Sequence, residues 1–241
     1  MKKIKYNGKN ILSPKCNKVF KGILGTEPND RLVDFLNNTL NINVECKEDI
    51  SICNSEIDKQ KKSDETSRLD LKVTTKEGRV DVEIQVLDEE NAIQNNLNYL
   101  NCLTRRSEPE GSRYEPSTTS IAVFICDYII RNEDETYHDK FKFFGTKTGT
   151  DSNLPLIIHI IELPKFNKNS DLDDTNKWMH FLTISDETEL EKVRGMDSIM
   201  SDSIDKLLHI SAKEEYEVGV KEGKLEASRN VARRMKNFGY D

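Results

Sequence analysis

Cysteine is scarce in this sequence, and its arrangement excludes two common kinds of covalent or metal framework. The chain has five cysteines, an odd number, and no two of them form a Cys-x-x-Cys motif. This pattern argues against a disulfide-stapled secreted domain and against a structural zinc site. We therefore expect reduced cysteines that pack as small apolar residues.

Long apolar runs are also missing. No stretch approaches the roughly 20 consecutive apolar residues that a membrane-spanning helix requires, and the mean hydropathy is −0.69. The basic residues near the N-terminus precede no apolar segment, which argues against a secretory signal. We expect a protein that resides in the cytoplasm and has no membrane partner.

The sequence lacks the motifs of several large enzyme classes. It contains no Gly-x-Ser-x-Gly motif and no P-loop, and its four histidines fall in separate predicted elements. Hydrolase triads and nucleotide-binding loops therefore have no support. His159 lies in an apolar run, so we expect a buried core histidine there rather than a ligand.

Negative charge dominates the composition, with a net charge of −7 and a pI near 5.3. This balance counts against an extended phosphate-binding surface, although metal-dependent nucleases gather acidic groups at their centre. Local basic clusters do occur, and each is either a nucleic-acid contact or a solvated face. They comprise residues 59–62, Arg105 with Arg106, and residues 229–236.

Apolar periodicity predicts the α/β class. Helices are expected first, then strands with one helix inserted among them, and then further helices. The expected helices span residues 13–25, 30–40, 89–106, 177–182, 187–194 and 198–210, with a last charged helix from 212. The expected strands span residues 50–57, 67–73, 80–86, 121–125, 137–144 and 156–163, and a Pro-, Gly- and Ser-rich loop spans 107–119.

The strands 67–73 and 80–86 carry the most informative pattern. Each alternates apolar and polar residues, so its polar side chains share one face. The short turn between the strands, ending at Gly78, predicts antiparallel pairing. Asp70 of the first strand and Glu83 of the second, followed by Gln85, then lie close together.

Two neighbouring carboxylates repel unless a cation lies between them. Oxygen ligands of this kind favour Mg²⁺ or Mn²⁺, which bind through one or two carboxylates together with water and phosphate oxygens. The alternative is a solvated polar face, which is common in antiparallel sheets. Alternation alone leaves both interpretations open.

Segments spread along the chain resemble the PD-(D/E)XK nuclease family transposases, also called recombination-promoting nucleases. These segments are Ile11–Lys15, Val19–Lys21, Phe35–Asn37, Arg68–Asp70, Glu83–Gln85, Ile161–Phe166 and Gly219–Ala227. The resemblance implies a restriction-endonuclease-like core, with a mixed central sheet flanked by helices and a C-terminal helical extension. It implies a nuclease-like domain over residues 1–205 and a charged helical tail over 206–241.

The function that the resemblance implies is Mg²⁺-dependent hydrolysis of DNA phosphodiesters by an endonuclease associated with transposition or recombination. Asp70 and Glu83 would bind the metal, together with the backbone carbonyl of Ile84. Gln85 stands where many relatives of the wider superfamily have Lys, although Gln is usual in this branch, and it would position water or phosphate by hydrogen bonding. Arg105 and Arg106 are candidate DNA contacts. The last helix would contact DNA, pair two copies as a homodimer or simply be solvated.

Two departures from the family pattern bear on activity. Asn17 stands where an acidic residue is expected in the first helix, and Asn95 stands where a basic residue is common. Tyr99 retains one of two expected tyrosines and, with Asn17, is a candidate supporting residue. A neutral amide is a weaker Mg²⁺ ligand than a carboxylate. The alternative function is therefore a weakened or inactive relative that binds DNA or a protein.

Overall fold

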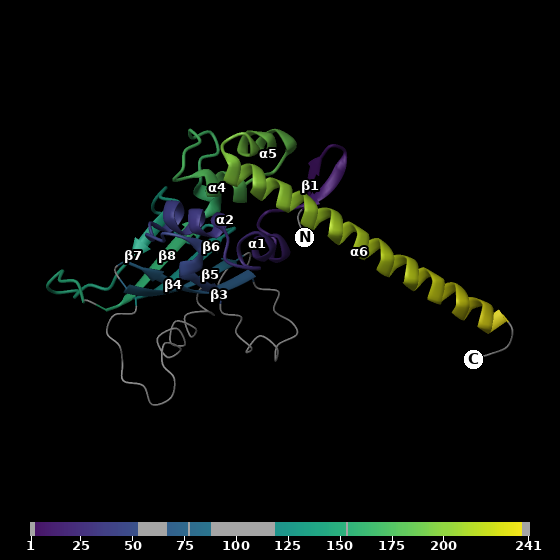
Figure 1. Cartoon of the computed structure of the whole chain (residues 1–241), viewed down its shortest axis with the longest axis horizontal. Helices are drawn as coiled ribbons and strands as arrows, with labels where there is room; N and C mark the ends of the chain where they lie inside the picture. Colours follow the sequence, from purple (N-terminus) through teal and green to yellow (C-terminus); the bar gives the residue numbers. More distant parts are fainter. Residues whose placement is uncertain (1–2, 53–66, 77, 88–118, 153, 238–241) are drawn as a thin grey trace, which may run out of the picture.

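The computed structural model describes residues 3–52, 67–76, 78–87, 119–152 and 154–237. Its largest element is a six-stranded sheet in the order β3-β4-β5-β6-β8-β7 (Figure 1). The strands are β3 (Ile50–Ile52), β4 (Ser67–Thr75), β5 (Gly78–Leu87), β6 (Thr119–Cys126), β7 (His138–Phe141) and β8 (Leu156–Glu162).

The sheet is mixed. Strands β3, β4 and β5 pair antiparallel, β5, β6 and β8 pair parallel, and β7 pairs antiparallel with β8 at the edge. A mixed sheet with helices packed against it agrees with the expected α/β class. The expected strand over 137–144 is found as β7. The expected helix over 89–106 and most of the expected loop lie outside the described residues.

Strand β6 is buried on both faces. Ile121, Val123 and Ile125 belong to the main hydrophobic core. Phe124 and Cys126 belong to a second, smaller cluster on the opposite face, with Ile158 and Ile160 of β8 packed against it. Burial raises the pKa of the Cys126 thiol to about 12, so this cysteine packs as the sequence predicts.

Helices cover one face of the large sheet (Figure 1). They are α1 (Asn17–Leu24), α2 (Asp30–Asp34), which continues as the π-helix η1 (Phe35–Thr39), α4 (Lys177–Leu182) and α5 (Glu187–Arg194). The short 3₁₀ helices η2 (Lys47–Asp49) and η4 (Leu163–Lys165) connect strands to this layer. Helix α1 buries Val19, Phe20 and Ile23 almost completely, as its apolar spacing predicts.

The last helix, α6 (Ser198–Asn237), is a single helix of 40 residues. Apolar periodicity predicted two helices separated near residue 211, and this prediction was wrong. Ser211 is buried and helical, and no proline or glycine between Gly195 and Gly219 interrupts the pattern. The first part of α6 packs on the core, whereas the rest extends away from the sheet (Figure 1).

A two-stranded hairpin, β1 (Lys3–Tyr6) and β2 (Lys9–Leu12), precedes α1. The sequence analysis predicted no element there. Asn7 and Gly8 form its turn with φ of 47° and 74°, and Asn-Gly is the residue pair that such two-residue turns favour. Within the described parts of the chain, no helix has the length and apolar character that a membrane crossing requires.

Candidate active site

The backbone of β4 and β5 places the two predicted acidic ligands opposite each other. The antiparallel register pairs Asp70 with Glu83 directly, as the predicted antiparallel turn requires. Directly opposed residues of an antiparallel pair share a face, with Cβ atoms about 5 Å apart. The structure describes the backbone here, and the side chains of Asp70, Glu83, Ile84 and Gln85 lie outside what it describes.

Neighbouring register positions define the face of the sheet on which this pair stands. Val73 of β4 and Val86 of β5 are buried in the main core on the helix-covered side. Since side chains alternate along a strand, the positions of Asp70 and Glu83 belong to the opposite face. The same register pairs Glu83 with Ala122 of β6, and Ala122 is only 1% exposed. The position of Glu83 therefore borders a buried residue, whereas Lys72, on the same face of β4, is exposed.

The register positions adjacent to the acidic pair carry positive charge. Arg68 and Lys72 stand two residues before and two residues after Asp70 along β4, so all three positions belong to one face. The register pairs Lys72 with Asp81 and Arg68 with Gln85. In this hairpin, a row is a pair of directly opposed residues. The row of Lys72 and Asp81 thus combines opposite charges, whereas the row of Asp70 and Glu83 on the same face combines two acids.

The remaining predicted site residues are only partly placed. Asn17 is the first residue of α1, a helix that contacts β4, but its side chain is outside the description. Asn95, Tyr99, Arg105 and Arg106 lie outside the described residues altogether. Among the side chains that the structure does describe, no three His, Cys, Asp or Glu residues gather as metal ligands.

A second acidic residue on this sheet is fully paired, and the sequence analysis did not identify its role. Glu162 ends β8 with 0% exposure. Its Oε1 accepts hydrogen bonds from the backbone N–H groups of Ile130 (2.5 Å) and Arg131 (3.1 Å), and its Oε2 accepts one from Lys165 Nζ (2.9 Å). Glu162 therefore fixes the segment that follows β6 against the end of β8.

The electrostatics of Glu162 suit a structural carboxylate. Burial alone raises the pKa of this group, but the hydrogen bonds from Lys165 and from the two backbone N–H groups outweigh burial and hold the pKa below its usual value. The carboxylate thus stays ionised with its oxygens occupied by protein donors. A group satisfied in this way has little capacity left for a metal ion.

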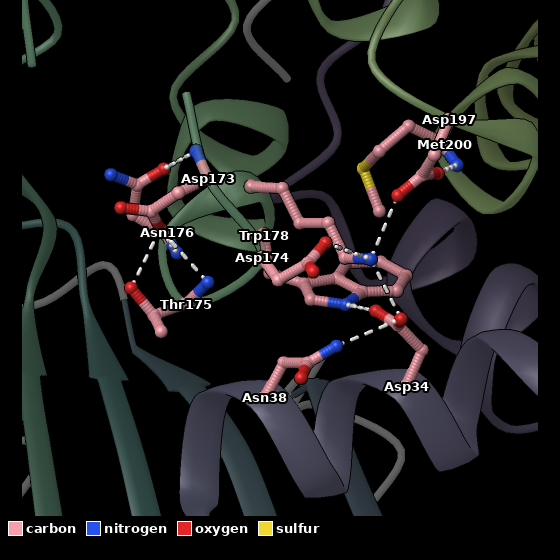
Figure 2. A network of polar contacts seen from close by, with 10 residues as sticks. Asp34, Asn38, Asp173, Asp174, Thr175, Asn176, Trp178, Asp197 and Met200 are labelled. Carbon is pink, nitrogen blue, oxygen red and sulfur yellow. Dashed lines mark hydrogen bonds and ion pairs between the residues drawn. The ribbon is translucent and has the colours of Figure 1, made fainter. Parts of the chain in front are cut away.

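The helical layer contains another charge cluster, in which the buried Lys177 contacts three aspartates that Figure 2 labels, Asp34, Asp174 and Asp197. Its Nζ lies 2.7 Å from Asp34 Oδ2, 2.8 Å from Asp197 Oδ2 and 3.4 Å from Asp174 Oδ1. Trp178 Nε1 donates to the other oxygen of Asp34 at 2.7 Å. Burial alone lowers the pKa of Lys177, but its bonds to Asp197 and Asp34 outweigh burial and raise it. This cluster ties α2 to α4 and to the start of α6.

His159 is buried, as its apolar strand predicts, with 3% exposure. Its Nδ1 lies 2.9 Å from His138 Nε2 on the neighbouring strand β7. Burial, together with the nearby His138 and Lys140, lowers the pKa of His159 to about 3. The imidazole is therefore neutral at physiological pH and acts as a packed core residue.

The sheet and its register define an α/β protein with an aspartate and a glutamate paired on adjacent strands. The sequence matches the family model of the PD-(D/E)XK nuclease family transposases over residues 14–233. The chain therefore belongs to that family. No curated protein and no solved structure matches it. Family membership supports a role related to nuclease activity or transposition.

Proposed function

We propose that the protein is a divalent-metal-dependent DNA endonuclease associated with transposition or recombination. The observation that supports this most directly is the register that pairs Asp70 with Glu83 in a member of a nuclease family. Like charges directly opposite each other destabilise a sheet, so a cation bound between them offsets that cost. The proposal includes a restriction-endonuclease-like core over residues 1–205, a helical tail over 206–241 and cytoplasmic residence.

The proposed donor set fits Mg²⁺ or Mn²⁺. The Asp70 and Glu83 carboxylates and the backbone carbonyl of Ile84 are all hard oxygen donors, the kind that these ions prefer. A bound ion of this type activates water and stabilises the negative charge that develops during phosphodiester hydrolysis. No sulfur or imidazole ligand is required, which agrees with the scarcity of cysteine and histidine.

The chain's own residues have distinct roles in this proposal. Asp70 and Glu83 hold the metal, and Gln85 donates and accepts hydrogen bonds to orient water or a phosphate oxygen. Gln85 carries no charge, so the positive charge near the substrate comes from other positions. Arg68 and Lys72, which flank Asp70 on the same face of β4, are suitably placed to attract phosphate. Arg105 and Arg106 remain proposed DNA contacts.

Cleavage of supercoiled plasmid by the full chain with Mg²⁺ or Mn²⁺ tests this function. We expect the wild type to nick or linearise the plasmid, and Asp70→Asn to reduce the rate by about a thousandfold or more, since the metal supplies most of the acceleration. Asp81→Asn is the matched control. It makes the same chemical change on the neighbouring strand β5, at a position that the register pairs with Lys72 and not with another acid. Equal rates for the wild type and Asp70→Asn, or no cleavage at all, would contradict the proposal.

The second candidate function is a weakened relative that binds DNA or a protein through the same fold. Asn17, the first residue of α1, favours it, because a neutral amide stands where the family pattern expects an acid. Calorimetric titration with Mn²⁺ separates the candidates: the proposed nuclease should bind Mn²⁺, and Asp70→Asn should not. If Mn²⁺ binds neither protein and both bind DNA, the non-catalytic candidate holds.

A further inference from the structure

The outer part of α6, residues 213–237, carries apolar side chains that the domain does not cover. Tyr216 is 74% exposed and Leu225 is 52% exposed, with Val218 and Val220 also exposed. By contrast, Met200, Ile204 and Leu207 in the first part of the same helix are completely buried. Lys18 of α1 pairs with Glu214 and Glu217 at the start of this part, and the helix continues beyond that contact (Figure 1). Most helical stability in proteins comes from tertiary packing of one face, which favours a packing partner for this part.

The apolar stripe that packs α6 on the domain continues along its outer part. Ile204, Ser211 and Val218 recur every seven residues, and Leu225 and Ala232 extend the same series. Residues seven apart lie on nearly the same side of a helix, as in the seam of a helix pair. The exposed Val218 and Leu225 therefore present the same face that the domain uses for packing. The series is apolar at one position in each heptad, with Glu214, Lys221 and Glu222 beside it, so charge as well as apolar contact decides how a second helix would pack here.

Charge along the outer part of α6 is divided into two blocks of opposite sign. Residues 214–226 contain five acidic residues and two lysines, whereas residues 229–236 contain four basic residues and no acidic one. Two copies aligned parallel would place acid against acid and base against base. Two copies aligned antiparallel would place each acidic block against the partner's basic block. The charge distribution is complementary to itself in only the antiparallel orientation.

We propose that residues 213–237 form a self-association surface through which two copies of this chain pair antiparallel. Centring the pair on Leu225 places positions 214–221 of one copy opposite positions 229–236 of the other. The two nuclease-like domains then lie at opposite ends of the helix pair. This proposal goes beyond the proposed function, because it depends on neither metal nor DNA.

Sedimentation velocity of the full chain without metal or DNA tests the pairing. We expect a wild-type dimer that weakens as salt is raised. Arg233→Glu with Arg234→Glu should weaken dimerisation by about tenfold or more. In this variant the acidic block of each copy faces a segment of the partner that has also become acidic, and like charges repel. Lys213→Glu with Lys221→Glu is the matched control, since it makes the same charge change on the acidic side of the centre, where position 221 lies opposite the partner's position 229. The control should dimerise at least as tightly as the wild type.

Other results would overturn the proposal. Parallel pairing would give the reverse pattern, with the lysine variant weakened and the arginine variant at least as tight as the wild type. A monomer at all concentrations would exclude the surface, and a monomer whose DNA affinity drops in the arginine variant would identify the basic block as a DNA contact instead. Leu225→Asp, which should abolish the dimer, tests the apolar seam separately. Circular dichroism of each variant verifies that the domain remains folded.

Discussion

Two pairs of opposed residues in the hairpin of β4 and β5 differ in how they combine charge. The backbone register of β4 and β5 pairs Lys72 with Asp81, an opposite-charge row, and pairs Asp70 with Glu83, a like-charge row, two residues away. The first arrangement is the usual one for stabilising a sheet, and the second opposes stability. In the proposed function a bound cation offsets this repulsion, in addition to Arg68 and Lys72 at positions on the same face. The comparison thus contrasts a row expected to stabilise the sheet with a row proposed to bind a metal.

The charge clusters elsewhere in the molecule support this distinction. Lys177 is surrounded by aspartates, and Glu162 is neutralised by Lys165 and backbone donors. Both groups are buried and satisfied by the protein itself. We therefore expect their removal to reduce stability, whereas removal of the charge at Asp70 should have the opposite effect.

The largest effect on stability is expected at Lys177. Lys177→Met keeps a side chain of similar length but leaves Asp34 and Asp197 without their buried cation, which should lower the free energy of unfolding by about 3 kcal/mol. Urea denaturation followed by circular dichroism measures this difference. Lys168→Met serves as the control, because Lys168 is partly exposed in its pair with Glu189, and such pairs contribute less than about 1 kcal/mol. Equal losses for the two variants would contradict the structural role of Lys177.

A smaller and pH-dependent effect is expected at Glu162. Glu162→Gln weakens charge-assisted hydrogen bonds and should lower stability at neutral pH by about 2 kcal/mol. Because the folded-state pKa of Glu162 lies below its usual value of 4.5, its contribution is present above that pH. It is lost as the pH falls through the lowered pKa. Unfolding measured from pH 7 down to pH 3 should show the gap between wild type and variant closing in acid. A gap that stays constant would exclude this ionisation as its origin.

The smallest effect, and one of opposite sign, is expected at Asp70. In the metal-free protein, Asp70→Asn removes the repulsion from Glu83 and should raise the free energy of unfolding by about 0.5 kcal/mol. Asp81→Asn should lower it by a similar amount, because it removes the attraction to Lys72. Thermal unfolding in the presence of a chelator measures both changes. Added Mn²⁺ should then stabilise the wild type but not Asp70→Asn. If both substitutions lowered the free energy of unfolding, the proposed repulsion between Asp70 and Glu83 would be contradicted.

Local patterns in the sequence predicted the features that depend on neighbouring residues. Alternation and the short turn were sufficient for the antiparallel pairing of β4 and β5, and helical spacing was sufficient for α1. The hairpin of β1 and β2 carried a usable signal in Asn7-Gly8, which the sequence analysis did not use. Treating α6 as two helices ignored the lack of any helix breaker near Ser211.

Other features depend on contacts between distant parts of the chain, so no local pattern could predict them. Glu162 interacts with a segment about thirty residues earlier, and Lys177 interacts with Asp34 across 143 positions. Sequence alone shows Lys177 as an ordinary lysine before a tryptophan. The roles of Asp70, Glu83 and Gln85 stay predictions, because the structure describes only their backbone.

The contact between the N-terminal hairpin and α6 has a consequence for how the protein is made. The backbone N–H of Leu12 donates to Ser211 Oγ at 3.0 Å, across 199 positions, and Gly22 of α1 leaves room for Ile210. These partners are the earliest and among the latest parts of the domain to leave the ribosome. During synthesis, the part of α1 that α6 covers in the folded protein therefore stays exposed until nearly the whole domain has been translated. Packing of this layer is completed late in translation, which leaves the nascent chain dependent on protection from aggregation until then.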